Sequence, residues 1–150
     1  MIALVQRVHR ASVTIDGRVV GRIGQGALVL LGVHRDDSTG EVDWLARKCA
    51  ALRIFSDEDA KMNRSIVDID GEALVVSQFT LYGNVERGNR PSFVESAPPE
   101  VATPLYEKFV ERLSELINRP VETGQFGAMM DVELINDGPV TISIERKPGS

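Results

Sequence analysis

Apolar and polar residues alternate in the N-terminal third of the chain with the period of two that is typical of β-strands. Residues 3–5 lead to a second apolar and polar alternation over residues 11–15. The dipeptide Asp16-Gly17 follows, and it is a strong signal for a two-residue hairpin. We therefore predict two short strands, a tight turn and a return strand over residues 18–23.

Two later runs, residues 27–33 and residues 73–76, are apolar on both faces, which is typical of strands buried within a sheet. The second run leads directly into Ser77-Gln78-Phe79-Thr80-Leu81. The polar, glycine-rich residues 82–91 that come next predict a loop. Functional groups often lie where a rigid strand passes into such a loop.

Two amphipathic segments predict helices. Ser38-Thr39-Gly40-Glu41 matches a capping box, and the apolar residues behind it recur at helical spacing. These residues are Val42, Leu45, Ala46, Cys49 and Leu52. The second helix is predicted to start near Thr103-Pro104 and to end at Arg119-Pro120. Its inner face is predicted to hold Leu105, Phe109, Leu113, Leu116 and Ile117.

The C-terminal segment predicts two more strands. Apolar residues alternate over residues 130–134 and again over residues 140–144. Asn136-Asp137-Gly138-Pro139 lies between them and predicts a connecting turn. Together with the helices, this pattern predicts a β-rich α+β domain in which two helices pack on a sheet or barrel.

With 150 residues, 43% of them hydrophobic, the chain has the size of one ordinary domain spanning residues 1–150. No apolar run approaches the roughly 18 to 20 residues that a membrane span needs. Residues 1–7 lack the features of a signal peptide, so we expect a cytoplasmic protein with no membrane partner. The only cysteine, Cys49, and the only histidines, His9 and His34, show none of the spacings of common zinc sites. No cofactor is therefore predicted, and among metals only carboxylate-bound magnesium remains an alternative.

The net charge of -5 argues against a protein that grips nucleic acid through a broad cationic surface. The charge is unevenly distributed, however. Residues 1–35 hold five arginines against Asp16 and have a net charge of +4, which leaves -9 for residues 36–150. A local basic face remains an alternative to a uniformly solvated acidic surface.

Taken by itself, the run from Ser77 to Leu81 is most simply the end of a strand. A catalytic role would require backbone N–H groups that point outward and hold an oxyanion. A serine or threonine nucleophile would also require a base within hydrogen-bond reach. Gly-x-Ser-x-Gly is absent, and nothing places His9 or His34 beside Thr80, which disfavours a conventional hydrolytic triad.

Asp137-Gly138-Pro139 taken by itself is a turn, because glycine adopts backbone angles closed to other residues and proline donates no hydrogen bond. Such a turn would also present its carbonyl oxygens in fixed directions. Carbonyl oxygens held in this way could accept hydrogen bonds from an ammonium group.

Together, Ser77-Gln78-Phe79-Thr80-Leu81 and Asn136-Asp137-Gly138-Pro139-Val140-Thr141 resemble the two signature motifs of the D-aminoacyl-tRNA deacylases, also called D-tyrosyl-tRNA deacylases. The resemblance covers essentially the whole chain. It includes Met1-Ile2-Ala3-Leu4-Val5-Gln6-Arg7-Val8, Arg53-Ile54-Phe55-Ser56-Asp57 and Arg87-Gly88-Asn89-Arg90-Pro91-Ser92-Phe93. One departure is Gly127-Ala128-Met129, which replaces the commoner Ala-Ala-Asp before Met130.

The resemblance implies a barrel-like domain with two flanking helices that works as a homodimer, with both active sites at the subunit interface. The implied partner is aminoacyl-tRNA, bound through its terminal adenosine and its D-amino acid. One wall of the pocket would consist of Ser77, Gln78, Phe79 and Thr80. Gly138-Pro139, joined by a cis peptide bond, would enter from the partner subunit, and Arg7 would hold it in orientation. Phe126 and Met130 would shape the adenosine pocket.

The implied reaction is hydrolysis of the ester between amino acid and ribose, with the oxyanion held by N–H groups around Gln78, Phe79 and Thr80. The family requires no metal, and the 2'-hydroxyl of the terminal adenosine would position the water. Thr80 would then position the reacting groups and would not act as the nucleophile. Chirality would be proofread by rejection, because carbonyls of Gly138 and Pro139 occupy the space of an L side chain. Glycine would also fit, which agrees with the family's removal of glycine from tRNA(Ala).

Two other functions remain open. The chain could be a different ester hydrolase that uses Thr80 as a covalent nucleophile, or a tRNA acceptor-end binding module without catalysis. The first would form an acyl-Thr80 intermediate, and the second would bind tRNA and leave the ester intact.

Overall fold

The computed structural model describes residues 1–150 and contains a six-stranded sheet, a two-stranded sheet and two α-helices. The strands are β1 (Ile2–Ile15), β2 (Arg18–Ile23), β3 (Gly26–Gly32), β4 (Phe55–Ser56), β5 (Met62–Arg64), β6 (Glu72–Ser77), β7 (Glu122–Thr123) and β8 (Asp131–Glu145). The helices are α1 (Thr39–Ala51), the 3-10 helix η1 (Phe79–Tyr82) and α2 (Pro99–Ile117).

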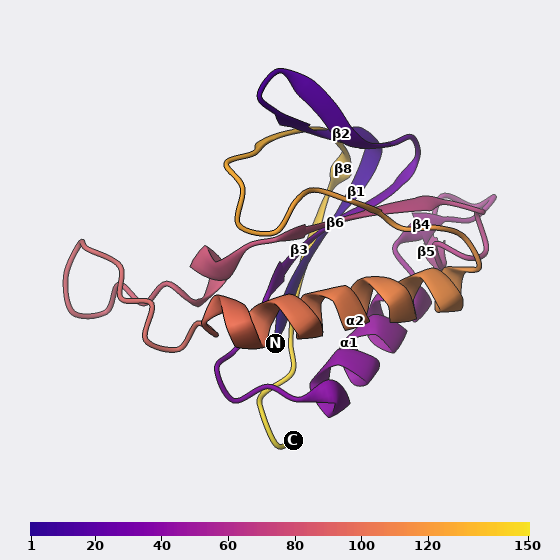
Figure 1. The fold of residues 1–150 in the computed structure, drawn as a ribbon. Coiled ribbons are helices and arrows are strands. Elements are labelled where there is room, and N and C mark those ends of the chain that lie inside the picture. The colour runs from indigo at the N-terminus through magenta and orange to yellow at the C-terminus, as the bar shows by residue number, and fades with distance from the viewer.

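The large sheet has the order β2-β1-β3-β6-β7, and β8 pairs with β1 along nearly its whole length. The β3-β6 and β6-β7 pairs are parallel, and the other pairs of this sheet are antiparallel. Figure 1 shows α1 and α2 together on one face of this sheet. The sheet curls until β2 meets β7, where a Cβ on Gly21 would lie only 2.5 Å from the carbonyl oxygen of Thr123. The predicted α+β, barrel-like fold with two flanking helices is confirmed.

Two apolar clusters fill the two sides of the sheet. The larger lies between the sheet and the helices, and Leu31, Leu45 and Phe109 are completely buried in it. The smaller lies inside the curl of the sheet, where Leu28 and Leu74 are completely buried. Neither α1 nor α2 combines the length and the apolar character that a membrane span needs.

Several local predictions are confirmed. Ile15 pairs with Arg18 across the predicted hairpin, and Asp16 and Gly17 both have positive φ, as a primed two-residue turn requires. Helix α1 begins at the predicted capping box, with Ser38 as its N-cap. The strands β3 and β6 are buried in the middle of the sheet, and the segment after η1 is a loop.

The predicted division of the N- and C-terminal segments into pairs of short strands is wrong. Each pair is one long strand, β1 with 14 residues and β8 with 15. The register between them shifts on both sides of Val8, and these irregularities exchange the faces of the two strands. The alternation of apolar and polar residues therefore changes phase at each shift. In the sequence this change resembles a break between two strands, although the backbone pairing continues.

The predicted start of α2 at Thr103-Pro104 is also wrong. The helix begins at Pro99, and the N–H of Ala102 already donates a helical hydrogen bond of 2.9 Å to the carbonyl of Pro98. Proline is well suited to the first turn, because the N–H groups there have no helical partner. Pro104 then removes only the bond to the carbonyl of Glu100, a solvent-exposed residue.

Candidate active site

The first candidate segment is the turn that connects β6 to η1. The N–H of Gln78 donates a 2.8 Å hydrogen bond to the carbonyl of Leu31, so the pairing with β3 continues one residue beyond Ser77. The turn packs directly on the backbone of Gly32. A Cβ at this position would lie 3.1 Å from Cβ of Leu81 and 3.3 Å from the carbonyl oxygen of Gln78. Glycine therefore lets the turn approach β3.

The turn contains two exposed residues whose backbone N–H groups have no partner within η1. Phe79 and Thr80 open η1, and the first N–H groups of a helix have no partner within it. No side chain caps this helix. The N–H of Gln78 was expected to act with them, but its bond to Leu31 engages it. Of the three N–H groups expected to hold an oxyanion, only those of Phe79 and Thr80 therefore remain candidates.

Thr80 has no activating base. Its Oγ1 accepts a hydrogen bond from Nε2 of Gln78, and no histidine, lysine or carboxylate bonds to it. His34 packs edge to face on Tyr82 at the end of η1, with ring centroids 5.3 Å apart, but its Nδ1 accepts the N–H of Asp36 and it forms no hydrogen bond to Thr80. Burial raises the pKa of Cys49 to about 12, so its thiol stays protonated at neutral pH. No group of three or more His, Cys, Asp or Glu side chains is placed to hold a metal ion.

The segment before α2 braces the turn from outside. Oγ of Ser96 donates a 2.9 Å hydrogen bond to the carbonyl of Phe79. The rings of Phe79 and Phe93 meet edge to face, with centroids 5.1 Å apart. Sequence reasoning missed both contacts. Nothing in the local pattern distinguishes Ser96 from any other loop serine.

The second candidate segment is a bulge in β8. Gln6 pairs with Thr141 and Val8 pairs with Asn136, so the four residues 137–140 lie opposite Arg7 alone. The excess residues leave the plane of the sheet. Both Gly138 and Pro139 are exposed, and the peptide bond between them is cis, as the resemblance implies.

Asn136 closes the bulge with its side chain. Its Oδ1 accepts the N–H of Val140 at 2.8 Å, and its Nδ2 donates to the carbonyl of Val140 at 3.1 Å. Nδ2 also lies 3.2 Å from Oγ1 of Thr141 and 3.2 Å from Oε1 of Gln6. One amide thus replaces the ladder bonds that the bulge interrupts. Asn136 lies in the recognised motif, but its function as a clamp was not predicted.

Arg7 lies against the same bulge, as expected from the resemblance. Its side chain is only 12% exposed, and Nε donates a 2.8 Å hydrogen bond to the carbonyl of Asp137. A second donor of the guanidinium bonds to the carbonyl of Ile54 at 2.7 Å. His9 approaches Oδ1 of Asp137 at 3.5 Å, a contact that the sequence did not indicate. Arg7 therefore ties the base of the bulge to the segment after α1.

Phe126 and Met130 belong to one loop, but they pack on different sides of the sheet. Phe126 is half-buried against the larger cluster, with its ring 5.9 Å from that of Tyr106. Met130 packs against the smaller cluster, and its sulfur fills the space beside Gly124. The loop follows β7, so it leaves the same end of the parallel strands as the turn after β6.

A single chain does not bring all these residues together. Ser77 pairs with Leu31, whereas Arg7 pairs with Ala27, four residues along β3. This separates the turn from the bulge by about 13 Å along the strands and by three strand spacings across the sheet. Two surface hollows, one between β1 and β2 and one in the loop after η1, contain none of the predicted site residues.

Comparison with known proteins identifies relatives across the whole chain. Residues 4–145 match the family described as D-Tyr-tRNA(Tyr) deacylase. The chain is 58% identical to the D-aminoacyl-tRNA deacylase of Salinibacter ruber, over 98% of each chain. It is also 58% identical to the protein of the same name from Thermomicrobium roseum, covering 100% of this chain and 99% of that one.

Two solved structures are similar. The c-Myc DNA unwinding element binding protein has a TM-score of 0.93 and 44% identity, covering 98% of this chain and 99% of that one. A probable eukaryotic D-amino acid tRNA deacylase has a TM-score of 0.80, covering 95% of this chain and 98% of that one. The second is only 17% identical, so it supports the fold alone.

The clamp formed by Asn136 is testable by substitution. Asn136→Ala removes an acceptor and a donor that satisfy Val140, so we expect the free energy of unfolding to fall by about 1 to 3 kcal/mol. Urea unfolding measures this change, and hydrogen exchange should show lost protection of the Val140 amide. Asn89→Ala is the matched control, because Asn89 is exposed and should change stability by less than about 0.5 kcal/mol. Equal effects of the two substitutions on the free energy of unfolding would contradict the conclusion that Asn136 closes the bulge.

Proposed function

The chain belongs to the D-Tyr-tRNA(Tyr) deacylase family, and we propose that it hydrolyses D-aminoacyl-tRNA where its Ser77–Thr80 turn meets the bulge of a second copy. The products are free tRNA and the D-amino acid. The match over residues 4–145 is the observation on which this function rests. The N–H groups of Phe79 and Thr80 support the proposal, because they have no partner within η1 and acyl transfer needs donors for an oxyanion.

The proposed assembly is a homodimer with both active sites at the subunit interface. Strand β8 pairs only with β1, so one edge of a 15-residue strand is left unpaired. Long unpaired edges favour association with another chain. The exposed Gly138 and Pro139 lie beside this edge, too far from their own turn to complete it. In a dimer with two-fold symmetry, the bulge of each subunit would meet the turn of the other, which would create two equal sites.

In the proposed pocket, the aminoacyl adenosine lies across the ends of the parallel strands. Phe126 and Met130 contact the adenosine from the loop after β7. Ser77 and Gln78 line the wall on which the amino acid rests. Arg7 acts at a distance from the substrate by holding the bulge that its own subunit inserts into the partner's site.

The proposed reaction is attack of water on the ester carbonyl. A bond forms from the water oxygen to the carbonyl carbon, and the carbonyl oxygen becomes an oxyanion held by the N–H groups of Phe79 and Thr80. The bond from carbon to ribose oxygen then breaks, and a proton from the water goes to that oxygen. The 2'-hydroxyl of the terminal adenosine positions the water, which agrees with a Thr80 hydroxyl already bonded to Gln78.

The proposed selectivity depends on main-chain carbonyls. Those of Gly138 and Pro139 accept hydrogen bonds from the α-ammonium of the substrate and stand where an L side chain would project. A D side chain points to open space, and glycine has no side chain to exclude. The pocket therefore rejects L-aminoacyl esters, accepts many D-aminoacyl esters and also accepts glycyl-tRNA(Ala).

A second candidate function is nucleic-acid binding without hydrolysis. One relative with 44% identity is named for binding a DNA unwinding element. On this alternative, the Ser77–Thr80 turn would contact the acceptor end of tRNA and leave the ester intact. Turnover measurements distinguish the two functions.

The main test compares D-Tyr-tRNA with L-Tyr-tRNA as substrates of the purified protein. We expect D-Tyr-tRNA to be hydrolysed at least about a hundredfold faster, because a steric clash of the L side chain costs several kcal/mol and each 1.4 kcal/mol is tenfold in rate. Release of labelled tyrosine from tRNA measures both rates. Glycyl-tRNA(Ala) should also be cleaved. Equal rates for the two tyrosyl esters would overturn chiral selection, and no cleavage of any ester would favour the binding module.

Thr80→Ala distinguishes a positioning hydroxyl from a nucleophile. We expect kcat to fall by about tenfold, because the substitution removes one hydrogen bond of Gln78 near the donors. Removal of a true nucleophile lowers kcat by about a millionfold in a well-studied protease. Single-turnover kinetics and mass spectra of quenched reactions give the measurement. An acyl group trapped on Thr80 would identify the covalent mechanism instead.

A further inference from the structure

The loop between η1 and α2 projects from the body of the molecule beside the candidate turn (Figure 1). All twelve residues from 84 to 95 are exposed. They include Phe93, which is 38% exposed, and its ring packs on that of Phe79, which is 56% exposed. Two adjacent aromatic rings thus face solvent at the edge of the proposed active site.

The loop is held in a defined shape. Asn84 and Ser92 exchange two backbone hydrogen bonds of 2.8 Å, which close it into a hairpin. Oδ1 of Asn84 accepts the N–H of Glu86 at 2.8 Å. The loop encloses a hollow of about 450 Å³, lined mainly by polar side chains. These bonds fix the shape of the hairpin, and the packing of Phe93 on Phe79 connects it to η1.

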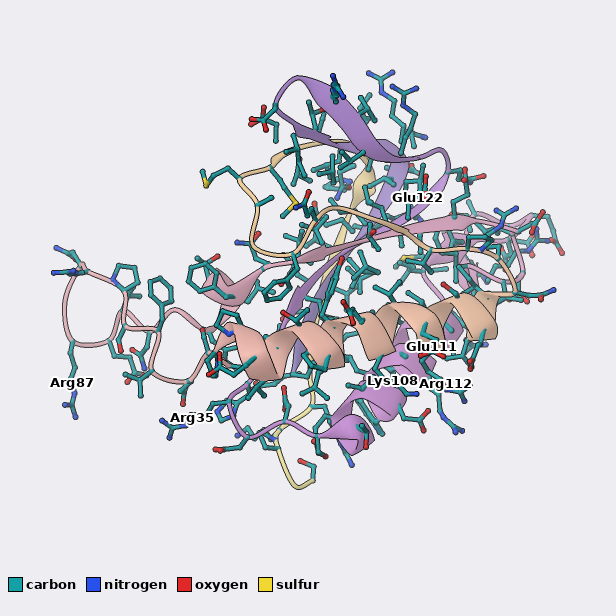
Figure 2. All side chains as sticks on the ribbon, viewed as in Figure 1. Arg35, Arg87, Lys108, Glu111, Arg112 and Glu122 are labelled. Carbon is teal, nitrogen blue, oxygen red and sulfur yellow. The ribbon has the colours of Figure 1, made fainter.

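Two arginines in this hairpin have no partner. Arg87 and Arg90 line the hollow, and neither forms an ion pair or a hydrogen bond in the structure. Figure 2 shows Arg87 at the tip of the loop, directed away from the rest of the protein. Glu86 and Glu95 line the same hollow, so the loop has little net charge. Broad attraction to phosphate is therefore excluded as the main source of binding, and local contacts must supply it.

We propose that this hairpin binds the unpaired nucleotides that precede the terminal adenosine of the tRNA. Their bases stack on the rings of Phe79 and Phe93, and their phosphates bond to Arg87 and Arg90. The inference rests on the proposed function, because it requires the terminal adenosine to lie in the neighbouring pocket. Proteins commonly hold unpaired RNA by aromatic stacking combined with arginine contacts.

The position of the hairpin favours this ligand. The backbone of Phe79 supplies a proposed oxyanion donor, while its ring lies on the loop side, so the two surfaces are continuous. A strand of RNA that leaves the pocket along this side meets the aromatic rings first and the arginines next. An acidic chain with net charge -5 can hold such a strand through a few directed contacts.

The test compares two substrates that share one reacting ester: D-Tyr-tRNA and adenosine esterified with D-tyrosine. The variants are Arg87→Ala combined with Arg90→Ala, and Phe93→Leu. Each should lower kcat/KM for D-Tyr-tRNA by about tenfold, chiefly through KM, since one stacked base or one directed contact has that magnitude. Each should change kcat/KM for the adenosine ester by less than about twofold. Lys108→Ala, at an exposed position on α2, is the control and should change neither.

Three results would overturn the inference. Equal losses of kcat/KM on both substrates would show that the hairpin only positions η1 and does not bind the tRNA. Unchanged cleavage of D-Tyr-tRNA by the variants would show that the proposed contacts do not contribute to binding. Altered oligomeric mass in light scattering would identify the hairpin as an interface between copies. If the unaltered protein cleaves neither ester, the proposed function fails, and fluorescence anisotropy with uncharged tRNA tests the hairpin separately: the double arginine variant should bind about tenfold more weakly.

Discussion

The pairing of β8 with β1 is the constraint on which the rest of the structure depends. Two strands of nearly equal length are hydrogen-bonded from end to end, yet β8 carries residues 137–140 opposite Arg7 alone, and these extra residues must leave the sheet. Asn136 closes the gap and Arg7 holds its base, so an exposed Gly138–Pro139 unit is built on a rigid strand and not on a loose loop. The same pairing leaves the outer edge of β8 free. Both features together support the proposal that a second copy of the chain completes the site.

The proposed chemistry follows from what the side chains do not supply. The hydroxyl of Thr80 already accepts a hydrogen bond from Gln78, and burial keeps Cys49 protonated. In the proposed site, the main polar groups directed at a substrate are backbone groups: N–H donors at the start of η1 and carbonyls of the bulge. A site of this kind senses the handedness of the α-carbon because main-chain atoms have fixed positions, whereas it has little means to distinguish one D side chain from another. Broad acceptance of D-amino acids and exclusion of L-amino acids are thus two consequences of the one proposed arrangement.

Local chemistry was sufficient to predict the hairpin at Asp16-Gly17, the capping box at Ser38 and the strand that leads to Ser77, because each depends on neighbouring residues only. The long strands were divided in two, since register shifts reverse the alternation on which strand prediction depends. The start of α2 was misplaced because proline is compatible with both the first helical position and a later one in the first turns. The bond of Ser96 to Phe79 and the loss of the Gln78 donor to Leu31 depend on tertiary contacts, for which the local pattern contains no signal.

Subunit complementation tests most directly whether the site is built from two chains. Gly138→Val distorts the bulge, where a Cβ would lie 2.5 Å from the Val140 nitrogen. Phe79→Pro removes one of the two proposed oxyanion donors at a helix position that proline tolerates. Each variant alone should be nearly inactive toward D-Tyr-tRNA. After equal mixing and subunit exchange, about a quarter of the unaltered activity should return, because half of the dimers are mixed and each mixed dimer has one intact site. Mixed dimers that form, as shown by mass spectrometry, but restore no activity would contradict the account.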